Sequence, residues 1–249
     1  MTYGLGILLD DGLVMASDSR TNAGVDHISA FPKMRIWEKP GERLIVLLSA
    51  GNLAITQAVA AELEDRIRLS DGKKRRKGST METVPGMTAA ARLVGEAVRR
   101  VHAHDAEALE QHGADFNATF ILGGQIKGGP MRLFLIYSAG NYIEAGPLTP
   151  FFQIGETKYG KPILDRVITP ETPLPEAVKC ALVSFDSTMR SNLSVGMPLD
   201  VLVAKRDAMA THHRRVIAED DAYMMDLRAE WGEGVRALFG RLVDPELEG

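Results

Sequence analysis

Three side chains near the start of the sequence have the types and spacing for acyl-transfer chemistry: Thr2, Asp18 and Lys33. A threonine hydroxyl is a weak nucleophile until a base takes its proton, and a free α-amine, with a pKa of about 8, is such a base. If Met1 is removed, Thr2 carries both groups. A lysine beside Thr2 would favour deprotonation of both, and Asp18 would keep that lysine charged and oriented. The three residues indicate an N-terminal nucleophile, although the same residue types also occur in this order by chance.

The elements that must position these residues are strands. Residues 3–9 form an apolar run that ends at the turn signal Asp10-Asp11-Gly12, and residues 13–19 form a second strand. Residues 31–37 are predicted as a third strand, which carries the lysine. Residues 44–48 are continuously apolar, which indicates a strand buried on both faces.

The rest of the chain alternates runs of helix and strand patterns. The predicted elements are a helix that Asn52 caps, a helix from residue 87, strands over 117–124, 131–137 and 142–154, helices over 163–167 and from 175, and a strand over 199–204. This order predicts an α+β fold with sheets facing each other and helices outside. We expect one domain over residues 1–249, since no linker or shift in composition divides the chain.

The order of residues at the start of the chain resembles that of proteasome β subunits. The matching residues are Thr2, Gly6-Ile7, Asp11-Gly12-Leu13-Val14-Met15-Ala16-Ser17-Asp18-Ser19-Arg20 and Lys33-Met34. The resemblance covers most of residues 2–206 and is strongest to the bacterial ancestral β-subunit type, Anbu, which has a long C-terminal tail. It implies a four-layer αββα sandwich of the N-terminal-nucleophile hydrolase type. It also implies that Thr2 is the nucleophile, that Asp18 and Lys33 are its charged partners, and that Arg20 is a structural neighbour.

Two further parts of the site follow from the same resemblance. The first is an oxyanion-binding backbone amide at the corner between a strand and a helix, where Leu48 or Ser49 stands and Gly51 lies further on. A backbone amide can donate a hydrogen bond whatever side chain its residue carries. The sequence therefore predicts an oxyanion-binding amide at this corner but leaves open which residue provides it. Small residues at this corner also suit simple helix packing.

The second part is a helix–loop–strand corner at which the family carries an Asp and a Ser. Asn192 and Val195 stand at those positions here, with Ser191 and Ser194 nearby as substitutes. An asparagine supplies no charge. This departure keeps open the alternative of a catalytically weak or inactive proteasome-like assembly or binding protein.

Composition narrows the classes of function. The 249-residue chain is 45% hydrophobic and 25% charged with a net charge of −4, which does not favour a nucleic acid or an anionic membrane as partner. The basic loop over residues 71–79 has no interleaved aromatic residues and is interpreted as solvated. The sequence shows no signal peptide and one cysteine, Cys180, so we expect a reduced, cytoplasmic setting.

The leading hypothesis is a threonine peptidase that acts on peptides or unfolded proteins within a self-assembled ring or helical oligomer, without a metal or organic cofactor. An amidohydrolase of small amides would use the same chemistry. An ATP-dependent unfoldase is a further partner that the resemblance allows. Residues 207–249 are expected to form a C-terminal helical extension, for which we slightly favour a contact with a neighbouring subunit.

Overall fold

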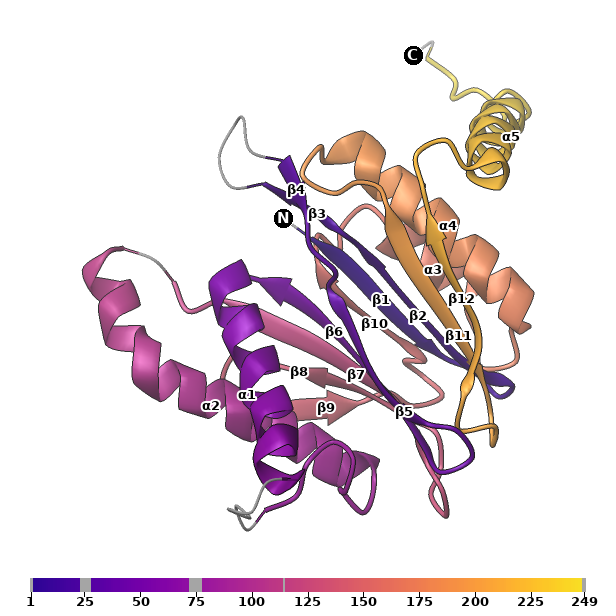
Figure 1. Cartoon of the computed structure of the whole chain (residues 1–249). Helices are drawn as coiled ribbons and strands as arrows, with labels where there is room; N and C mark the ends of the chain where they lie inside the picture. Colours follow the sequence, from indigo (N-terminus) through magenta and orange to yellow (C-terminus); the bar gives the residue numbers. More distant parts are fainter. Residues whose placement is uncertain (1, 23–27, 72–77, 114, 248–249) are drawn as a thin grey trace.

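Two five-stranded antiparallel sheets form the centre of the molecule (Figure 1). The computed structural model describes residues 2–22, 28–71, 78–113 and 115–247. The first sheet has the order β10-β1-β2-β11-β12 and the second β5-β6-β7-β8-β9, while β3 and β4 pair separately. The bounds of the strands are β1 Tyr3–Leu8, β2 Gly12–Asp18, β3 Arg20–Asn22, β4 Ile28–Ala30, β5 Met34–Lys39, β6 Arg43–Gly51, β7 Ala118–Ile126, β8 Arg132–Ile136, β9 Tyr142–Glu144, β10 Phe151–Gly155, β11 Leu199–Lys205 and β12 Thr211–Ile217.

Helices cover the outer face of each sheet. The helices of the described residues are α1 Leu53–Asp71, α2 Met87–Gln111, α3 Lys161–Val167, α4 Leu174–Ser191 and α5 Ala222–Phe239. Helices α1 and α2 pack on β6, β7 and β8, and α4 packs on β1 and β2. The elements therefore stack as helices, sheet, sheet and helices, which confirms the expected α+β class.

Three hydrophobic cores fill the spaces between these layers, and strand β2 shows why. Every residue of β2 is buried, because its two faces contact different cores. Val14 and Ala16 face the core beneath α4, whereas Leu13 and Met15 face the core between the sheets. This alternation follows from the two-residue period of a strand. Strand β6 behaves in the same way, which confirms the expected burial on both faces.

Strand β1 lies deep in this structure. Gly6 on β1 faces the opposite sheet, where an added Cβ would lie 2.8 Å from Ile121 Cγ2 and Leu133 Cδ1. Glycine at this position therefore lets the two sheets approach each other around the strand that follows Thr2.

One predicted strand is wrong. The segment over residues 142–154 is two strands, because a turn with a bridge between Gly146 and Thr149 interrupts it. Strand β9 extends the second sheet, and β10 pairs with β1 in the first. The chain thus crosses from one sheet to the other here, and this crossing places β10 beside Thr2.

The last part of the chain adds a strand and a helix. Strand β12 pairs with β11 at the edge of the first sheet. Helix α5 begins at Asp221, whose side chain accepts a hydrogen bond from the Met224 N–H, and it packs on α4 through Met224 and Leu227. None of the helices in the described ranges is both long and apolar enough to cross a membrane. Residues 72–77 of the predicted basic loop lie outside the described residues.

Candidate active site

Asp18 and Lys33 form a buried ion pair at the head of β1. The Lys33 Nζ lies 2.8 Å from Asp18 Oδ1, and the two side chains are 5% and 0% exposed. The ammonium also donates to the Arg20 carbonyl oxygen at 2.6 Å. The sequence therefore placed these two charged residues together correctly, although it did not reveal the bond to Arg20.

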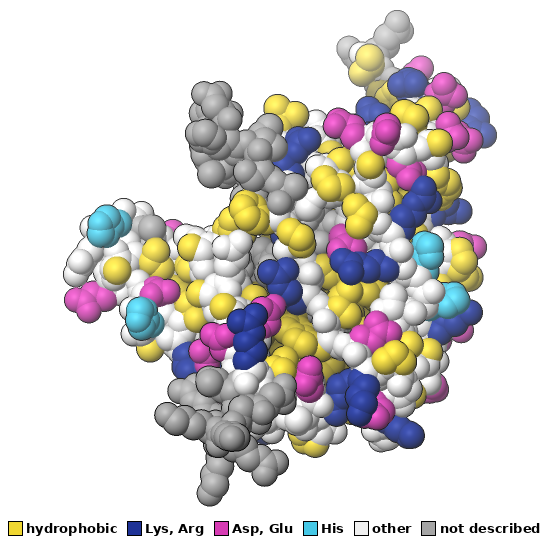
Figure 2. Space-filling model, in the orientation of Figure 1, with side chains coloured by type: hydrophobic (Ala, Val, Ile, Leu, Met, Phe, Trp, Pro, Cys, Tyr) yellow, Lys and Arg dark blue, Asp and Glu magenta, His cyan; other side chains and the backbone are white. Residues whose placement is uncertain are grey.

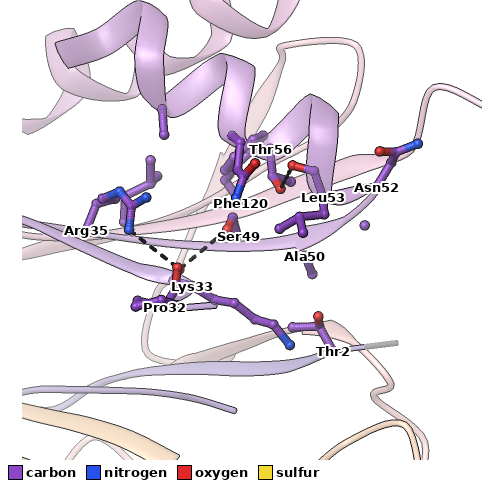
Figure 3. Close-up of a pocket in the computed structure, with 14 residues that line it drawn as sticks. Thr2, Pro32, Lys33, Arg35, Ser49, Ala50, Asn52, Leu53, Thr56 and Phe120 are labelled. Atoms are coloured by element: carbon purple, nitrogen blue, oxygen red, sulfur yellow. Dashed lines mark hydrogen bonds between the residues drawn. The ribbon is translucent and has the colours of Figure 1, made fainter. Parts of the chain in front are cut away.

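The ion pair is tied to Thr2 through the backbone of the next residue. Asp18 Oδ1 also accepts a hydrogen bond from the Tyr3 N–H at 3.1 Å, and Asp18 Oδ2 accepts one from the Gly196 N–H at 3.5 Å. Thr2 is 8% exposed and lines a cavity of about 240 Å³ together with Lys33. Figure 3 shows the Lys33 side chain running toward Thr2.

Burial sets the electrostatics of this pair. Loss of water around Lys33 lowers the pKa of its amine, and the attraction of Asp18 opposes this shift. Loss of water also raises the pKa of Asp18, against the attraction of Lys33 and the two backbone N–H groups. Burial therefore works against the charge on each member of the pair, and each charge is stabilised by the other.

Tyr3 fixes the direction of the strand that carries Thr2. Its hydroxyl lies 2.8 Å from Ser184 Oγ on α4 and accepts a hydrogen bond from Gln153 Nε2 at 2.7 Å. Burial raises the pKa of Tyr3 to about 12, so this phenol stays neutral. Since successive side chains of a strand point to opposite faces, the burial of Tyr3 against α4 directs Thr2 toward the other sheet.

The corner between β6 and α1 lies on the other side of Thr2. Asn52 caps α1, because its Oδ1 accepts a hydrogen bond from the Ala54 N–H at 3.0 Å, as the sequence predicts. The Ser49 N–H is used within the sheet, where it donates to the Lys33 carbonyl at 3.1 Å. The Asn52 N–H donates to Asn117 of the neighbouring chain segment at 2.7 Å. The N–H groups of a strand alternate in direction, so Gly51 directs its own N–H away from that segment, beyond the start of β5.

A second cavity of about 550 Å³ also borders Thr2. It lies between the start of β7 and the ends of β8 and β10, and the polar residues of its lining include Tyr137, Gln153 and Thr157. Thr2 and Gly51 line both cavities. Thr2 therefore lies between two cavities, which could receive the substrate groups on either side of the bond that is cleaved.

The helix–loop–strand corner after α4 is arranged differently from the expectation. Ser191 is exposed, and Val195 is buried. The Ser194 N–H donates to Asn192 Oδ1 at 2.9 Å. Arg20 donates to the Leu193 carbonyl at 3.1 Å, which fits its predicted place as a neighbour of the site. The structure thus places Asn192 and Ser194 at this corner and directs Ser191 to solvent.

Sequence reasoning missed one residue of this region, Glu156. It follows β10, is 7% exposed, and accepts a hydrogen bond from Asn192 Nδ2 at 2.9 Å. Its N–H donates to the Thr2 carbonyl at 2.8 Å. The missing negative charge at residue 192 was the signal that could have prompted a search for a carboxylate elsewhere. Among the described residues no cluster of three His, Cys, Asp or Glu residues could hold a metal ion.

Comparisons with known proteins identify the class. No protein-family model and no curated protein matches the chain. Among solved structures, Anbu (ancestral β-subunit) from Yersinia bercovieri is 48% identical with a TM-score of 0.89, and the match covers 99% of this chain and 100% of that one. A structure described as the helical assembly of the Anbu complex from Pseudomonas aeruginosa is 50% identical with a TM-score of 0.91, and the match covers 98% of each chain. An Anbu (Gly-1) mutant from Hyphomicrobium sp. strain MC1 is 47% identical with a TM-score of 0.91, over 99% of this chain and 100% of that one.

Identities of this size over nearly full chains confirm the resemblance that the opening residues carry. The architecture is that of a proteasome-like β subunit. The chain belongs to the Anbu family.

Proposed function

We propose that this protein is an N-terminal threonine hydrolase that cleaves amide bonds of peptides. The observation that carries the proposal is the buried Asp18–Lys33 pair, which is hydrogen-bonded to the residue after Thr2 and lies beside a cavity that Thr2 lines. In this proposal the stacked sheets and helices are the αββα sandwich of N-terminal-nucleophile hydrolases. The whole chain is a single domain with residues 207–249 as its C-terminal extension.

The reaction begins with removal of Met1, which frees the amine of Thr2. The Thr2 Oγ–H proton passes to this amine, directly or through a water molecule, and Oγ attacks the carbonyl carbon of the substrate. The Lys33 ammonium favours the deprotonated hydroxyl, and Asp18 holds that ammonium in place. The protonated amine then gives its proton to the leaving amine, which leaves an acyl ester on Thr2 that water hydrolyses.

The negative charge that develops on the carbonyl oxygen needs a donor. We assign this role to the Gly51 N–H, because the Ser49 N–H already donates to the Lys33 carbonyl. Gly51 has φ of +115°, and an added Cβ would lie 2.2 Å from the Asn117 oxygen. Glycine is therefore required at this position both for the backbone conformation and for the approach to the next strand.

The cavity on the α1 side offers room for one side chain of a peptide. Its lining combines apolar residues such as Leu47 and Phe120 with the polar residues Arg35, Thr56 and Gln57. The second cavity, whose lining adds Tyr137, Gln153 and Thr157 to apolar residues, would receive the residue on the leaving-group side. Two separate spaces fit an extended peptide better than a compact small amide, which is the alternative substrate.

We also propose that the chain assembles with copies of itself, as the described helical assembly of a relative suggests. The end of α5 and the residues after it expose large apolar side chains, among them Leu238, Phe239, Leu242 and Val243. A group of this kind marks a contact surface more often than a solvated one. Elsewhere, on the face shown in Figure 2, acidic and basic side chains are interspersed. The proposed location is the cytoplasm, and an ATP-dependent unfoldase is a proposed partner.

A catalytically inactive assembly protein is the second candidate, and the uncharged Asn192 is the observation in its favour. It would keep the fold and the ion pair but not the reactivity of Thr2. The experiment below separates the two candidates.

The test combines the intact mass of the untagged protein with an electrophile that reacts with N-terminal threonine. We expect a mass lacking one methionine and stoichiometric labelling, which Thr2→Ala abolishes and Thr2→Ser retains. We also expect Thr2→Ala to remove hydrolysis of peptide substrates while Tm and oligomer size stay unchanged. Equal turnover in Thr2→Ala and the wild type, or a wild-type protein that keeps Met1 and takes no label, would overturn the proposed function.

A further inference from the structure

Glu156 is a buried carboxylate that the reaction proposed above does not yet use. Its backbone is bonded to Thr2, because the Glu156 N–H donates to the Thr2 carbonyl at 2.8 Å. Gly155 before it has φ of +80°, and an added Cβ there would lie 1.9 Å from the Thr2 oxygen. The turn at the end of β10 therefore holds Glu156 against the end of β1 from which the Thr2 amine extends.

Asn192 holds the Glu156 carboxylate from the end of α4. The amide of Asn192 has one accepting and one donating end, and the Ser194 N–H occupies the accepting end at 2.9 Å. The donating Nδ2 consequently points at Glu156 Oε2, at 2.9 Å. This orientation suits only an acceptor at residue 156.

The identity of residue 192 follows from this contact. An aspartate there would accept from Ser194 equally well, but its second oxygen would face the Glu156 carboxylate. Two carboxylates at this distance repel, and one of them must take up a proton. Asn192 and Glu156 are therefore a matched pair, in which the negative charge lies at the end of a strand instead of at the end of a helix.

We propose that Glu156, held by Asn192, is a positioning residue that orients the α-amine of Thr2 and stabilises its protonated form during the reaction. This inference rests on the proposed function, since it concerns the amine that acts as the base. When Thr2 Oγ–H loses its proton to this amine, the new ammonium lies beside a fixed carboxylate. The ammonium then returns the proton to the leaving amine of the substrate.

The other charges around this amine are known from the structure. Asp18 ends β2 of the first sheet, Lys33 directly precedes β5 of the second, and the two neutralise each other at 2.8 Å. Arg20 is directed at the Leu193 carbonyl. Lys158 has its Nζ 3.8 Å from Glu156 Oε1, but its side chain is 75% exposed and solvent screens it. Within the described ranges, Asp18 is thus paired with a buried cation, whereas the cation beside Glu156 is exposed.

The test measures the rate of electrophile labelling at Thr2 against pH in four proteins: the wild type, Glu156→Gln, Asn192→Asp and the double variant. In Glu156→Gln we expect the labelling rate to reach a lower plateau at high pH. We also expect the acid limb, the pH range over which the rate rises as the Thr2 amine loses its proton, to shift to lower pH by about one unit. A nearby anion raises the pKa of an amine by about that much or more, so its removal lowers that pKa. A loss of packing alone would lower the plateau without moving the limb. Lys158→Met is the control, and its acid limb should stay near that of the wild type.

The double variant reverses the pair and provides the sharpest test. The side-chain amide introduced at position 156 would donate to a carboxylate at position 192, while the Ser194 N–H keeps its acceptor. We expect Asn192→Asp alone to lower Tm, and the double variant to restore both Tm and the position of the acid limb. If the wild type takes up the label but Glu156→Gln leaves the acid limb in place, or the double variant fails to restore it, the inference is wrong and the proposed function stands. If the wild type takes up no label, both are wrong.

Discussion

Two buried aspartates in this protein hold their cations in opposite ways. Asp186 on α4 is 4% exposed and contacts Arg190 at 3.1 Å and Arg228 of α5 at 2.9 Å. Those arginine side chains keep 65% and 26% of their exposure. Asp18 is fully buried, and so is nearly all of Lys33.

This difference in the exposure of the cations indicates that the pairs of Asp186 serve the stability of the fold. An arginine that keeps contact with water loses little solvation, so the pairs of Asp186 attach α5 to α4 at a small cost. When both ions lose their water, the cost of desolvation often exceeds the attraction between them. Replacing the charges of such a pair with uncharged groups is often neutral or stabilising. The ion pair beside Thr2 is therefore best explained by chemistry, and the predictions below test this contrast.

The largest effect is expected from Lys33→Met. It leaves the Asp18 charge buried without its cation, which should lower the free energy of unfolding by about 3–5 kcal/mol. Labelling of Thr2 should fall by about 10²–10³-fold, the range for loss of one group that stabilises developing negative charge. Urea unfolding and labelling kinetics measure the two effects.

The double variant Asp18→Asn, Lys33→Met separates stability from chemistry. It removes both charges, so we expect the unfolding free energy to return to that of the wild type or above it, while labelling stays lost. If the double variant labels as fast as the wild type, the pair has no part in the reaction.

The pH dependence of stability sharpens the same comparison. The folded pKa of Asp18 lies above its ordinary value of 3.8, so its ionisation costs stability as pH rises above 3.8. The folded pKa of Lys33 lies below its ordinary value of 10.5, so its charge costs stability until pH approaches 10.5. Relative to the double variant, the wild type should be least stable at intermediate pH and should gain toward both extremes. A difference that is constant from pH 4 to pH 10 would contradict these shifts.

The pairing of Asp18 with Lys33 was predicted from the chemistry of the two residue types and from the resemblance of the opening residues to proteasome β subunits. The sequence did not predict the partner strand of β10, since the segment over residues 142–154 has a strand-like composition throughout and only tertiary packing decides where it changes sheet. The role of Glu156 was hidden for a similar reason, because its partner Asn192 is far away in the chain. The Ser49 amide was a candidate oxyanion donor until the strand register showed that Lys33 uses it.

The smallest effects are expected at the partners of Asp186. Two substitutions there test how the exposure of an arginine side chain changes the contribution of its ion pair to stability. Arg228→Met removes the cation that joins two helices and should lower the unfolding free energy by about 1 kcal/mol. Arg190→Met removes a mostly exposed partner on the same helix and should change it by less than about 0.5 kcal/mol. Neither substitution should alter the rate at which Thr2 is labelled, because neither arginine lines the two cavities that border Thr2. If Arg190→Met destabilised the protein as much as Lys33→Met, exposure would not be what distinguishes the two aspartates, and the functional explanation of the Asp18–Lys33 pair would lose its physical basis.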